Sequence, residues 1–246
     1  MEKTYTESLT VRAVDCDQYG KMRLNSLFSA MQEGGEQHAR LLGIGHQALL
    51  NRQLFFALAR IHVSVLSTPR IGDQLKHTTW PGEINRFFCP RYHVFSRDDG
   101  TPMAAVGALW VMLDTHTRRI VSPIQADLHM PDNSDLPAPT ELPLHLPSRI
   151  TAAYTTSKRL VPYSDKDVNG HVNNTRYISW LCDALGAQAF DGYHISSLTA
   201  GYEREIRDEN PLEIHLSQSE HNFTYEVVSG NASRHFLAIG SFSEDA

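Results

Sequence analysis

The chain has 246 residues, of which 41% are hydrophobic and 20% are charged, and its formal net charge is −6. This composition is that of an ordinary soluble globular protein, and the negative charge argues against a general nucleic-acid binder, because such proteins need a cationic surplus. No apolar run approaches the roughly 18–20 residues of a membrane span, and the first residues lack the layout of a signal peptide. Three cysteines in dissimilar contexts, Cys16, Cys89 and Cys182, indicate no disulfide framework, so we expect a reducing, cytoplasmic setting.

The first half begins with a polar segment, Asp15-Cys-Asp-Gln-Tyr-Gly-Lys21, and continues with the spacing of an amphipathic helix. The apolar face of this helix has Leu24, Leu27, Phe28, Met31, His38, Leu41 and Leu42, and Gly43 predicts its end. Gly34 and Gly35 lie mid-helix, where each costs about 1 kcal/mol relative to alanine, so we expect close packing or room for a ligand there. Strand-like runs separated by turn signals follow at residues 56–66, 74–80, 87–96 and 103–113.

Residues 124–148 are rich in proline and show little periodicity, which predicts a linker. A second amphipathic helix follows it, with Asn174 or Thr175 as the expected cap. The apolar face of this second helix has Tyr177, Ile178, Leu181, Ala184, Leu185 and Gln188. Further strands are predicted at residues 197–206, 212–217, 222–229 and 234–242.

The two halves repeat one pattern. Asp15, Asp17 and Gly20 match residues that lie 150 positions further on, within Asp165-Lys-Asp-Val-Asn-Gly170. Each half reads as a strand, a long helix and then four or more antiparallel strands. This order predicts an α+β protein of two tandem hotdog domains, each a long helix wrapped by a curved antiparallel sheet, that form an internal pseudo-dimer. The predicted division is 1–123 for the N-terminal domain, 124–148 for the linker and 149–246 for the C-terminal domain.

The second copy of the repeat carries the side chains of a catalytic site. Asp167, Asn169 and His171 occupy alternate positions, so an extended segment would send all three side chains to one side. The helix start that follows supplies unpaired backbone N–H groups and positive dipole density. Together these groups supply a base, an orienting amide and a site for an oxyanion, which attack on a carbonyl requires. From the residues alone, a polar capping turn with a structural His171 remains an alternative.

The segment from Ser164 to Asn174, with its sequence Ser-Asp-Lys-Asp-Val-Asn-Gly-His-Val-Asn-Asn, resembles the signature of the acyl-[acyl carrier protein] thioesterases of plants and bacteria. The resemblance covers nearly the whole chain, including the Asp-Cys-Asp opening and the run from Leu113 to Arg119. The family's Tyr-Arg-Arg-Glu stretch matches Tyr202-Glu-Arg-Glu205 with one change, which implies a catalytic Glu205. Many members have a cysteine directly after this glutamate, whereas this chain has Ile206.

The resemblance implies catalytic roles for Asp167, Asn169, His171 and Glu205. We expect Glu205, near His171, to act as the base or to orient the attacking water. Asn169 would position that water or hold the thioester, and Asp167 would fix the imidazole, although a nucleophilic role for Asp167 through an anhydride stays open.

Backbone N–H groups are expected to bind the oxyanion at the second helix's start, at Val172, Asn173 and Asn174. The spacing further places Glu203 and Glu205 on one face of a strand.

The first half lacks this constellation, because Tyr19 and Lys21 stand where the second half has Asn169 and His171. We therefore expect one active site per chain, and the resemblance implies that the first half walls the acyl-chain pocket. Cys182 is expected to be a packed thiol. No spacing typical of metal ligands and no glycine-rich phosphate loop occurs, so neither a metal nor a cofactor is predicted.

The resemblance implies that the chain hydrolyses fatty acyl-[acyl carrier protein], releasing free fatty acid and ending chain elongation, with acyl carrier protein as its partner. Two alternatives remain: an acyl-coenzyme A thioesterase on the same fold, and a non-catalytic acyl-binding hotdog module. Association of two pseudo-dimers into a homodimer is also left open, as are the length and unsaturation of the acyl chain.

Overall fold

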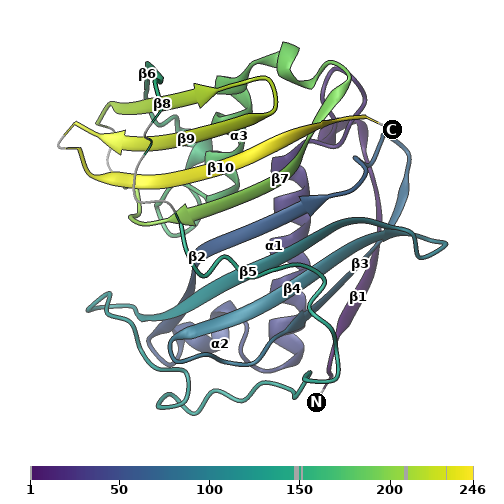
Figure 1. Ribbon diagram of the computed structural model, residues 1–246. Coiled ribbons are helices and arrows are strands. Elements are labelled where there is room, and N and C mark those ends of the chain that lie inside the picture. Colours follow the sequence, from purple (N-terminus) through teal and green to yellow (C-terminus); the bar gives the residue numbers. More distant parts are fainter. Residues whose placement is uncertain (1, 147–149, 151, 208–209, 231, 246) are drawn as a thin grey trace.

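The computed structural model describes residues 2–146, 150, 152–207, 210–230 and 232–245. Its strands form one ten-stranded antiparallel sheet in the order β1-β3-β4-β5-β2-β7-β10-β9-β8-β6 (Figure 1). The strands are β1 (Tyr5–Thr10), β2 (Leu54–Val65), β3 (Gln74–Pro81), β4 (Phe88–Arg97), β5 (Pro102–Asp114), β6 (Thr155–Arg159), β7 (Tyr193–Tyr202), β8 (Leu212–Gln218), β9 (Asn222–Ser229) and β10 (Arg234–Glu244). The helices are α1 (Leu24–Leu41), α2 (His46–Leu50) and α3 (Asn174–Leu185), with 3₁₀ turns at Ala13–Asp15, Tyr163–Asp165 and Ala187–Phe190.

The sheet is built from two halves of five strands that meet where β2 pairs with β7. The junction is antiparallel, with Arg60 opposite Gly201 and Ser64 opposite Ser197. Both long helices, α1 and α3, lie on the same face of the sheet and pack against each other (Figure 1). The predicted α+β class and the repeat of a long helix with an antiparallel sheet are confirmed.

One hydrophobic cluster joins the two halves. Phe28 and Met31 of α1 are fully buried in it together with Ile178 and Leu181 of α3. Burying such a side chain contributes about 1.5–3 kcal/mol, so each half depends on the other for a substantial part of its core. Among the described residues, no helix combines the length and the apolar composition of a membrane span.

The first predicted helix is confirmed, and Gly43 with a φ of +75° follows its end. Leu41, which was expected on the buried face, is 62% exposed. The buried stripe instead runs along Met31, Gly35, His38 and Leu42, at spacings of three and four residues, and Leu41 lies one position off this stripe.

The second helix differs from its prediction at both ends. Its cap is Asn173, whose side chain accepts from the backbone of Thr175 at 2.9 Å, rather than Asn174 or Thr175. The helix ends before Gly186, which has a φ of +80°, so Gln188 lies in the following 3₁₀ turn. The strand after it, β7, begins four residues earlier than predicted and ends at Tyr202 instead of reaching residue 206.

Residues 124–146 of the proline-rich segment form no helix or strand, and they pack across the sheet. Arg60 of β2 donates to the carbonyl of Pro143 at 3.4 Å. The segment passes so close to β5 that a Cβ on Gly107 would lie 2.6 Å from the Glu141 carbonyl, so only glycine fits there. Pro147 and residues 148 and 149, which hold the predicted end of the linker and the start of the second domain, lie outside the described residues.

Candidate active site

The segment that carries His171 is a tight turn, and the prediction that it is extended is wrong. The Asp167 N–H donates to the His171 carbonyl at 2.8 Å, and Gly170, with a φ of +73°, donates back to the Asp167 carbonyl at 3.0 Å. The Asp167 side chain closes the turn, because its Oδ1 accepts from the backbone of Asn169 at 2.8 Å and of His171 at 3.4 Å. An aspartate that bonds its own backbone and a glycine in the left-handed region favour such a turn over a strand.

The turn sets the exposure of the three predicted side chains. Asn169 lies exposed at its tip, and its side chain makes no hydrogen bond with any described residue. Asp167 is half-buried, while the His171 side chain is mostly buried. The Asp167 carboxylate is therefore bonded to backbone amides of the turn, and its charge opposes the lowering of the His171 pKa by burial.

The structure brings His171 and Glu205 together. The His171 Nε2 atom lies 3.4 Å from a carboxylate oxygen of Glu205. Glu205 follows the end of β7 in an irregular segment, which is fixed to the turn because the Val172 N–H donates to the carbonyl of the buried Ile206 at 3.0 Å. Because β7 ends at Tyr202, neither Glu203 nor Glu205 lies on a strand, and the prediction that they share one strand face is wrong. Glu203 accepts from Arg234 at 3.0 Å.

The N-terminal half also reaches this site, which the sequence did not predict. Arg118, in the turn after β5, forms an ion pair with Glu205, and Arg207 pairs with the same carboxylate at 3.0 Å. The Arg118 guanidinium lies over the ring of Phe55 at 4.5 Å from its centroid. The family resemblance includes the run from Leu113 to Arg119, but the sequence of that run does not predict which residues Arg118 contacts.

The electrostatic environment keeps His171 able to accept a proton. Burial lowers the pKa of the His171 imidazole below its ordinary value, and the carboxylate of Glu205 opposes this shift. The nearby guanidinium of Arg207 lowers the same pKa further. The neutral ring is therefore the dominant form at neutral pH, which a general base requires.

Two of the three predicted oxyanion donors are already engaged. The Val172 N–H donates to Ile206, and the Asn173 N–H donates to the carbonyl of Asp165 at 2.9 Å, so the prediction that these amides are unpaired is wrong. No acceptor among the described residues takes the N–H of Asn174, the first residue of α3. This amide and the positive end of the helix remain to stabilise a negative oxygen.

The N-terminal copy of the motif has the same turn. The Oδ1 of Asp17 accepts from the backbone of Tyr19 at 2.9 Å and of Lys21 at 3.0 Å, and Gly20 has a φ of +73°. Met22 donates to the carbonyl of residue 69 at 2.7 Å, as Val172 does to that of residue 206 in the other half. The backbone of the repeat is therefore preserved although its side chains differ.

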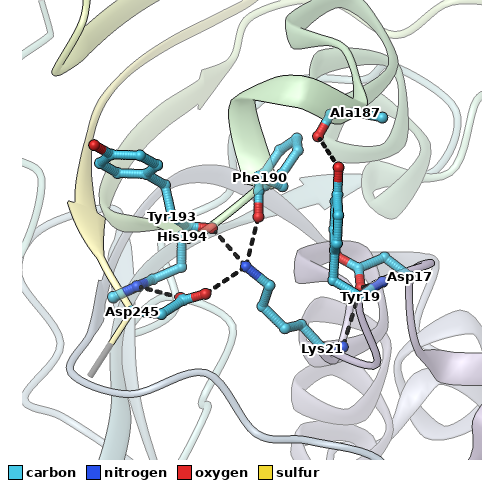
Figure 2. A network of polar contacts seen from close by, with 8 residues as sticks. All are labelled: Asp17, Tyr19, Lys21, Ala187, Phe190, Tyr193, His194 and Asp245. Carbon is cyan, nitrogen blue, oxygen red and sulfur yellow. Dashed lines mark hydrogen bonds and ion pairs between the residues drawn. The ribbon is translucent and has the colours of Figure 1, made fainter.

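Lys21, the counterpart of His171, has become a structural cation (Figure 2). Its Nζ donates to the carbonyls of Phe190 at 2.6 Å and Tyr193 at 2.9 Å, and to the carboxylate of Asp245 at 2.6 Å. Only 4% of Lys21 is exposed, so the ammonium uses its three donors inside the protein. This arrangement places a hydrogen-bonded lysine where the second copy has an imidazole, and it ties the C-terminal strand region to the N-terminal half.

Replacing Lys21 by methionine is expected to destabilise the protein by about 3 kcal/mol, because it leaves the partners of a buried ion pair unsatisfied. The chemical step should keep nearly its full rate, since Lys21 lies at the other copy of the motif. Denaturant unfolding and thioester hydrolysis measure the two effects. The control is Lys3→Met, which breaks an exposed pair with Asp135 and should change the unfolding free energy by less than about 1 kcal/mol. A loss of turnover like that of a His171 variant would contradict the assignment.

Among the described residues, no three His, Cys, Asp or Glu side chains are grouped as ligands of a metal ion. Cys182 lies in α3, and burial raises the pKa of its thiol to about 12, which keeps it protonated and unreactive. The prediction that Cys182 is a packed thiol is in accord with this environment.

Comparison with known proteins identifies the family. The model of the acyl-ACP thioesterase N-terminal domain matches residues 2–130, and that of the C-terminal domain matches residues 149–242. A chloroplastic dodecanoyl-[acyl-carrier-protein] hydrolase of Cinnamomum camphora is 26% identical over 228 residues, which covers 85% of this chain and 58% of that protein. A chloroplastic palmitoyl-acyl carrier protein thioesterase of Gossypium hirsutum is 25% identical over 253 residues, covering 98% and 61%. The chain thus spans about three-fifths of the length of these relatives.

Two solved structures share the fold over nearly their whole length. An acyl-ACP thioesterase from Bacteroides thetaiotaomicron superposes with a TM-score of 0.84 at 22% identity, covering 98% of both chains. A 12:0-ACP thioesterase from Umbellularia californica gives a TM-score of 0.80 at 22% identity, again covering 98% of both. The predicted tandem hotdog fold is thereby confirmed. With family models over both halves of its sequence, the chain belongs to the acyl-ACP thioesterase family.

Proposed function

We propose that the protein hydrolyses the thioester of a fatty acyl chain carried by acyl carrier protein, releasing free fatty acid and ending elongation. The observation that carries this proposal is the contact of the neutral His171 with Glu205 beside the start of α3. The names of the relatives from Cinnamomum camphora and Gossypium hirsutum, which refer to acyl carrier protein, support the carrier.

Thioester hydrolysis requires mainly that a water molecule is activated and that the oxyanion is stabilised. The leaving group is a thiolate, and an ordinary thiol has a pKa near 8.5, so it needs little acid assistance. In the proposed step the pair of His171 and Glu205 removes a proton from water, whose oxygen then bonds to the thioester carbon. The Asn174 N–H and the helix start stabilise the resulting oxyanion. Breakage of the carbon–sulfur bond expels the thiolate, which takes the proton back from the pair.

The turn suggests distinct roles for Asp167 and Asn169. One oxygen of the Asp167 carboxylate is occupied by two backbone amides, which favours a positioning role over nucleophilic attack through an anhydride. Asn169 is exposed at the tip of the turn, where its amide can hold the thioester or the attacking water.

We further propose that residues 1–123 form the acyl-binding half and residues 149–246 the catalytic half, joined by the linker at 124–148. A cavity of about 110 Å³ lies between α1 and the strands β2, β4 and β5 of the N-terminal half, and Phe56 lines it. The preceding residue, Phe55, lies under Arg118, which pairs with Glu205. Phe55 and Phe56 are consecutive in β2, and consecutive side chains of a strand project to opposite faces of the sheet.

The test is hydrolysis of one acyl chain presented on acyl carrier protein and on coenzyme A. Clearly higher kcat/KM with the carrier protein supports the proposed substrate. Equal or better turnover of acyl-coenzyme A would favour an acyl-coenzyme A thioesterase, and binding without turnover of either would favour a non-catalytic module. The cytoplasmic location and the association of two copies remain predictions.

Asn169→Ala is expected to lower hydrolysis of the preferred thioester by about 100-fold, because the variant loses the amide that orients the reacting group. Steady-state kinetics measure this loss. Val168→Ala is the matched control, since Val168 is the adjacent residue of the same turn and is 95% exposed, and it should keep the wild-type rate. A folded Asn169→Ala protein with near-wild-type turnover would remove Asn169 from the site.

A further inference from the structure

Glu205 has to keep its carboxylate against His171, although the chain around it does not fix the side chain. Because β7 ends at Tyr202, Glu205 lies in an irregular segment, and its side chain is 34% exposed. A glutamate side chain has several rotatable bonds, and it samples many rotamers when it faces solvent. Its contact with the His171 Nε2 atom, at 3.4 Å, therefore depends on groups that restrain the carboxylate.

Two guanidinium groups bind this carboxylate, and they use different oxygens. Arg118 binds Oε1, whereas Arg207 binds Oε2 at 3.0 Å, which is the oxygen that faces His171. Arg207 is two residues from Glu205 in the same irregular segment, and its side chain is 57% exposed. An ion pair that is so local and so exposed is screened by salt and moves with the segment, so it does not fix Glu205 relative to the rest of the protein.

Arg118 is held by a different part of the fold. It lies 87 residues from Glu205 in the turn after β5, where its N–H donates to the Asp114 carbonyl at 3.0 Å. The Asp114 side chain closes this turn, because its Oδ1 accepts from the backbone of Thr117 at 2.7 Å. The guanidinium lies over the ring of Phe55 in β2, at 4.5 Å from the ring centroid, and such stacking restrains a planar cation. Arg118 thus connects Oε1 of Glu205 to the sheet of the N-terminal half.

The backbone of Arg118 also indicates that its side chain is used. Its φ is +58°, in the left-handed region that glycine adopts without the steric cost that a side chain brings. Such a conformation persists where surrounding contacts hold it. The contacts that the Arg118 side chain makes are the ring of Phe55 and the carboxylate of Glu205.

We propose that Arg118 is a positioning residue of the active site, which holds Oε1 of Glu205 so that Oε2 stays against His171. The catalytic pair of the C-terminal half is then complete only with a residue of the N-terminal half. This inference rests on the proposed function, and it adds a residue that acts through Glu205 rather than on the thioester.

The test is a double-mutant cycle on kcat, with wild type, Arg118→Met, Glu205→Ala and the double variant. Arg118→Met alone is expected to lower kcat by about 10-fold and to leave KM within about two-fold, because it loosens the catalytic pair without removing a contact to the acyl chain. In the Glu205→Ala background the same change should lower kcat by less than about two-fold, since no carboxylate is left to position. A purely structural role of Arg118 would lower kcat by the same factor in both backgrounds.

Two further variants and one structure separate position from charge. Arg119→Met is the matched control, because Arg119 is exposed and is the next residue of the chain, and it should keep the wild-type kcat. Arg118→Lys keeps the charge but loses the planar fork, so its kcat should lie between those of wild type and Arg118→Met. A crystal structure of Arg118→Met is expected to show the Glu205 carboxylate turned away from His171, with a melting temperature near that of wild type.

Wild-type kcat in Arg118→Met, the same loss in both backgrounds, or an equal loss in Arg119→Met would overturn the inference. A Glu205 carboxylate that stays against His171 in the Arg118→Met crystal structure would overturn it as well. Any of these results with normal turnover by wild type leaves the proposed function in place. Wild type that hydrolyses no acyl thioester would overturn the proposed function instead, and the crystal structure of the variant would then decide the role of Arg118.

Discussion

Replacing His171 by alanine is expected to lower kcat for acyl-ACP hydrolysis by at least about 100-fold, the scale of a lost general base. The imidazole lies 3.4 Å from Glu205, and no other titratable side chain of the described residues is in ion-pair contact with it. The fold should persist, because the turn is held by backbone bonds and by Asp167 rather than by the ring. Steady-state kinetics with a circular dichroism spectrum and a melting curve test both statements.

The matched control is His129→Ala, since the side chain of His129 is 70% exposed and lies in the proline-rich segment. This variant should keep the wild-type kcat. Near-wild-type turnover by a folded His171→Ala protein would show that the imidazole takes no part in the chemistry, and Glu205 alone would then have to activate water.

The same imidazole predicts how activity depends on pH. Because the pKa of His171 is lowered, the neutral ring persists below the ordinary histidine value of 6.5, and activity should fall only as the pH drops through this lower pKa. The folded protein binds this proton more weakly than the unfolded chain. The contribution of His171 to stability is therefore complete above about pH 6.5 and is lost as the pH falls through the folded pKa. A pH profile of kcat/KM locates this fall of activity on the acid side, which is called the acid limb below.

Local sequence patterns predicted the elements well and the contacts between them poorly. The helical spacing from Leu24 and the stop at Gly43 located α1, since both features are set by nearby residues. The contact of Arg118 with Glu205 joins positions 87 residues apart across the two halves. A strand-and-turn motif is a local pattern and does not predict the distant residues that it contacts. The sequence therefore placed Arg118 in the run that resembles the family, but not in the site.

The turn around Gly170 was missed for a different reason. Alternation of polar residues favours an extended segment, whereas the Asn169-Gly170 pair within the same run favours a turn with a left-handed glycine. The burial of two histidines in the N-terminal half was also not foreseen. His77 and His93 are buried residues of β3 and β4, and alternation alone does not say that a histidine faces the interior.

The two copies of the motif show how one backbone serves two purposes. Asp17 and Asp167 close the same turn, so the residue that follows the glycine is presented in the same way in both halves. At Lys21 this residue binds internal carbonyls and a carboxylate, whereas at His171 it faces one carboxylate with a ring that can exchange a proton. The turn thus fixes the backbone in both copies, and the chemistry depends on the side chain that follows the glycine.

Replacing Glu205 by glutamine is expected to lower kcat by about 100-fold, because the variant loses the carboxylate that shares the proton with His171. It should also move the acid limb of the pH profile. Glu205 raises the pKa of His171 in opposition to burial and to Arg207, so its removal should lower that pKa and shift the limb to lower pH. Kinetics over a pH series measure both the rate and the shift.

Glu203→Gln is the matched control, since it makes the same chemical change two residues away in a carboxylate that pairs with Arg234. It should leave both the rate and the limb in place. Equal losses in the two variants would mean that general charge near the site, rather than contact with His171, supports turnover. A limb that moves to higher pH in Glu205→Gln would mean that it reports a group other than His171, and the base would have to be sought elsewhere in the site.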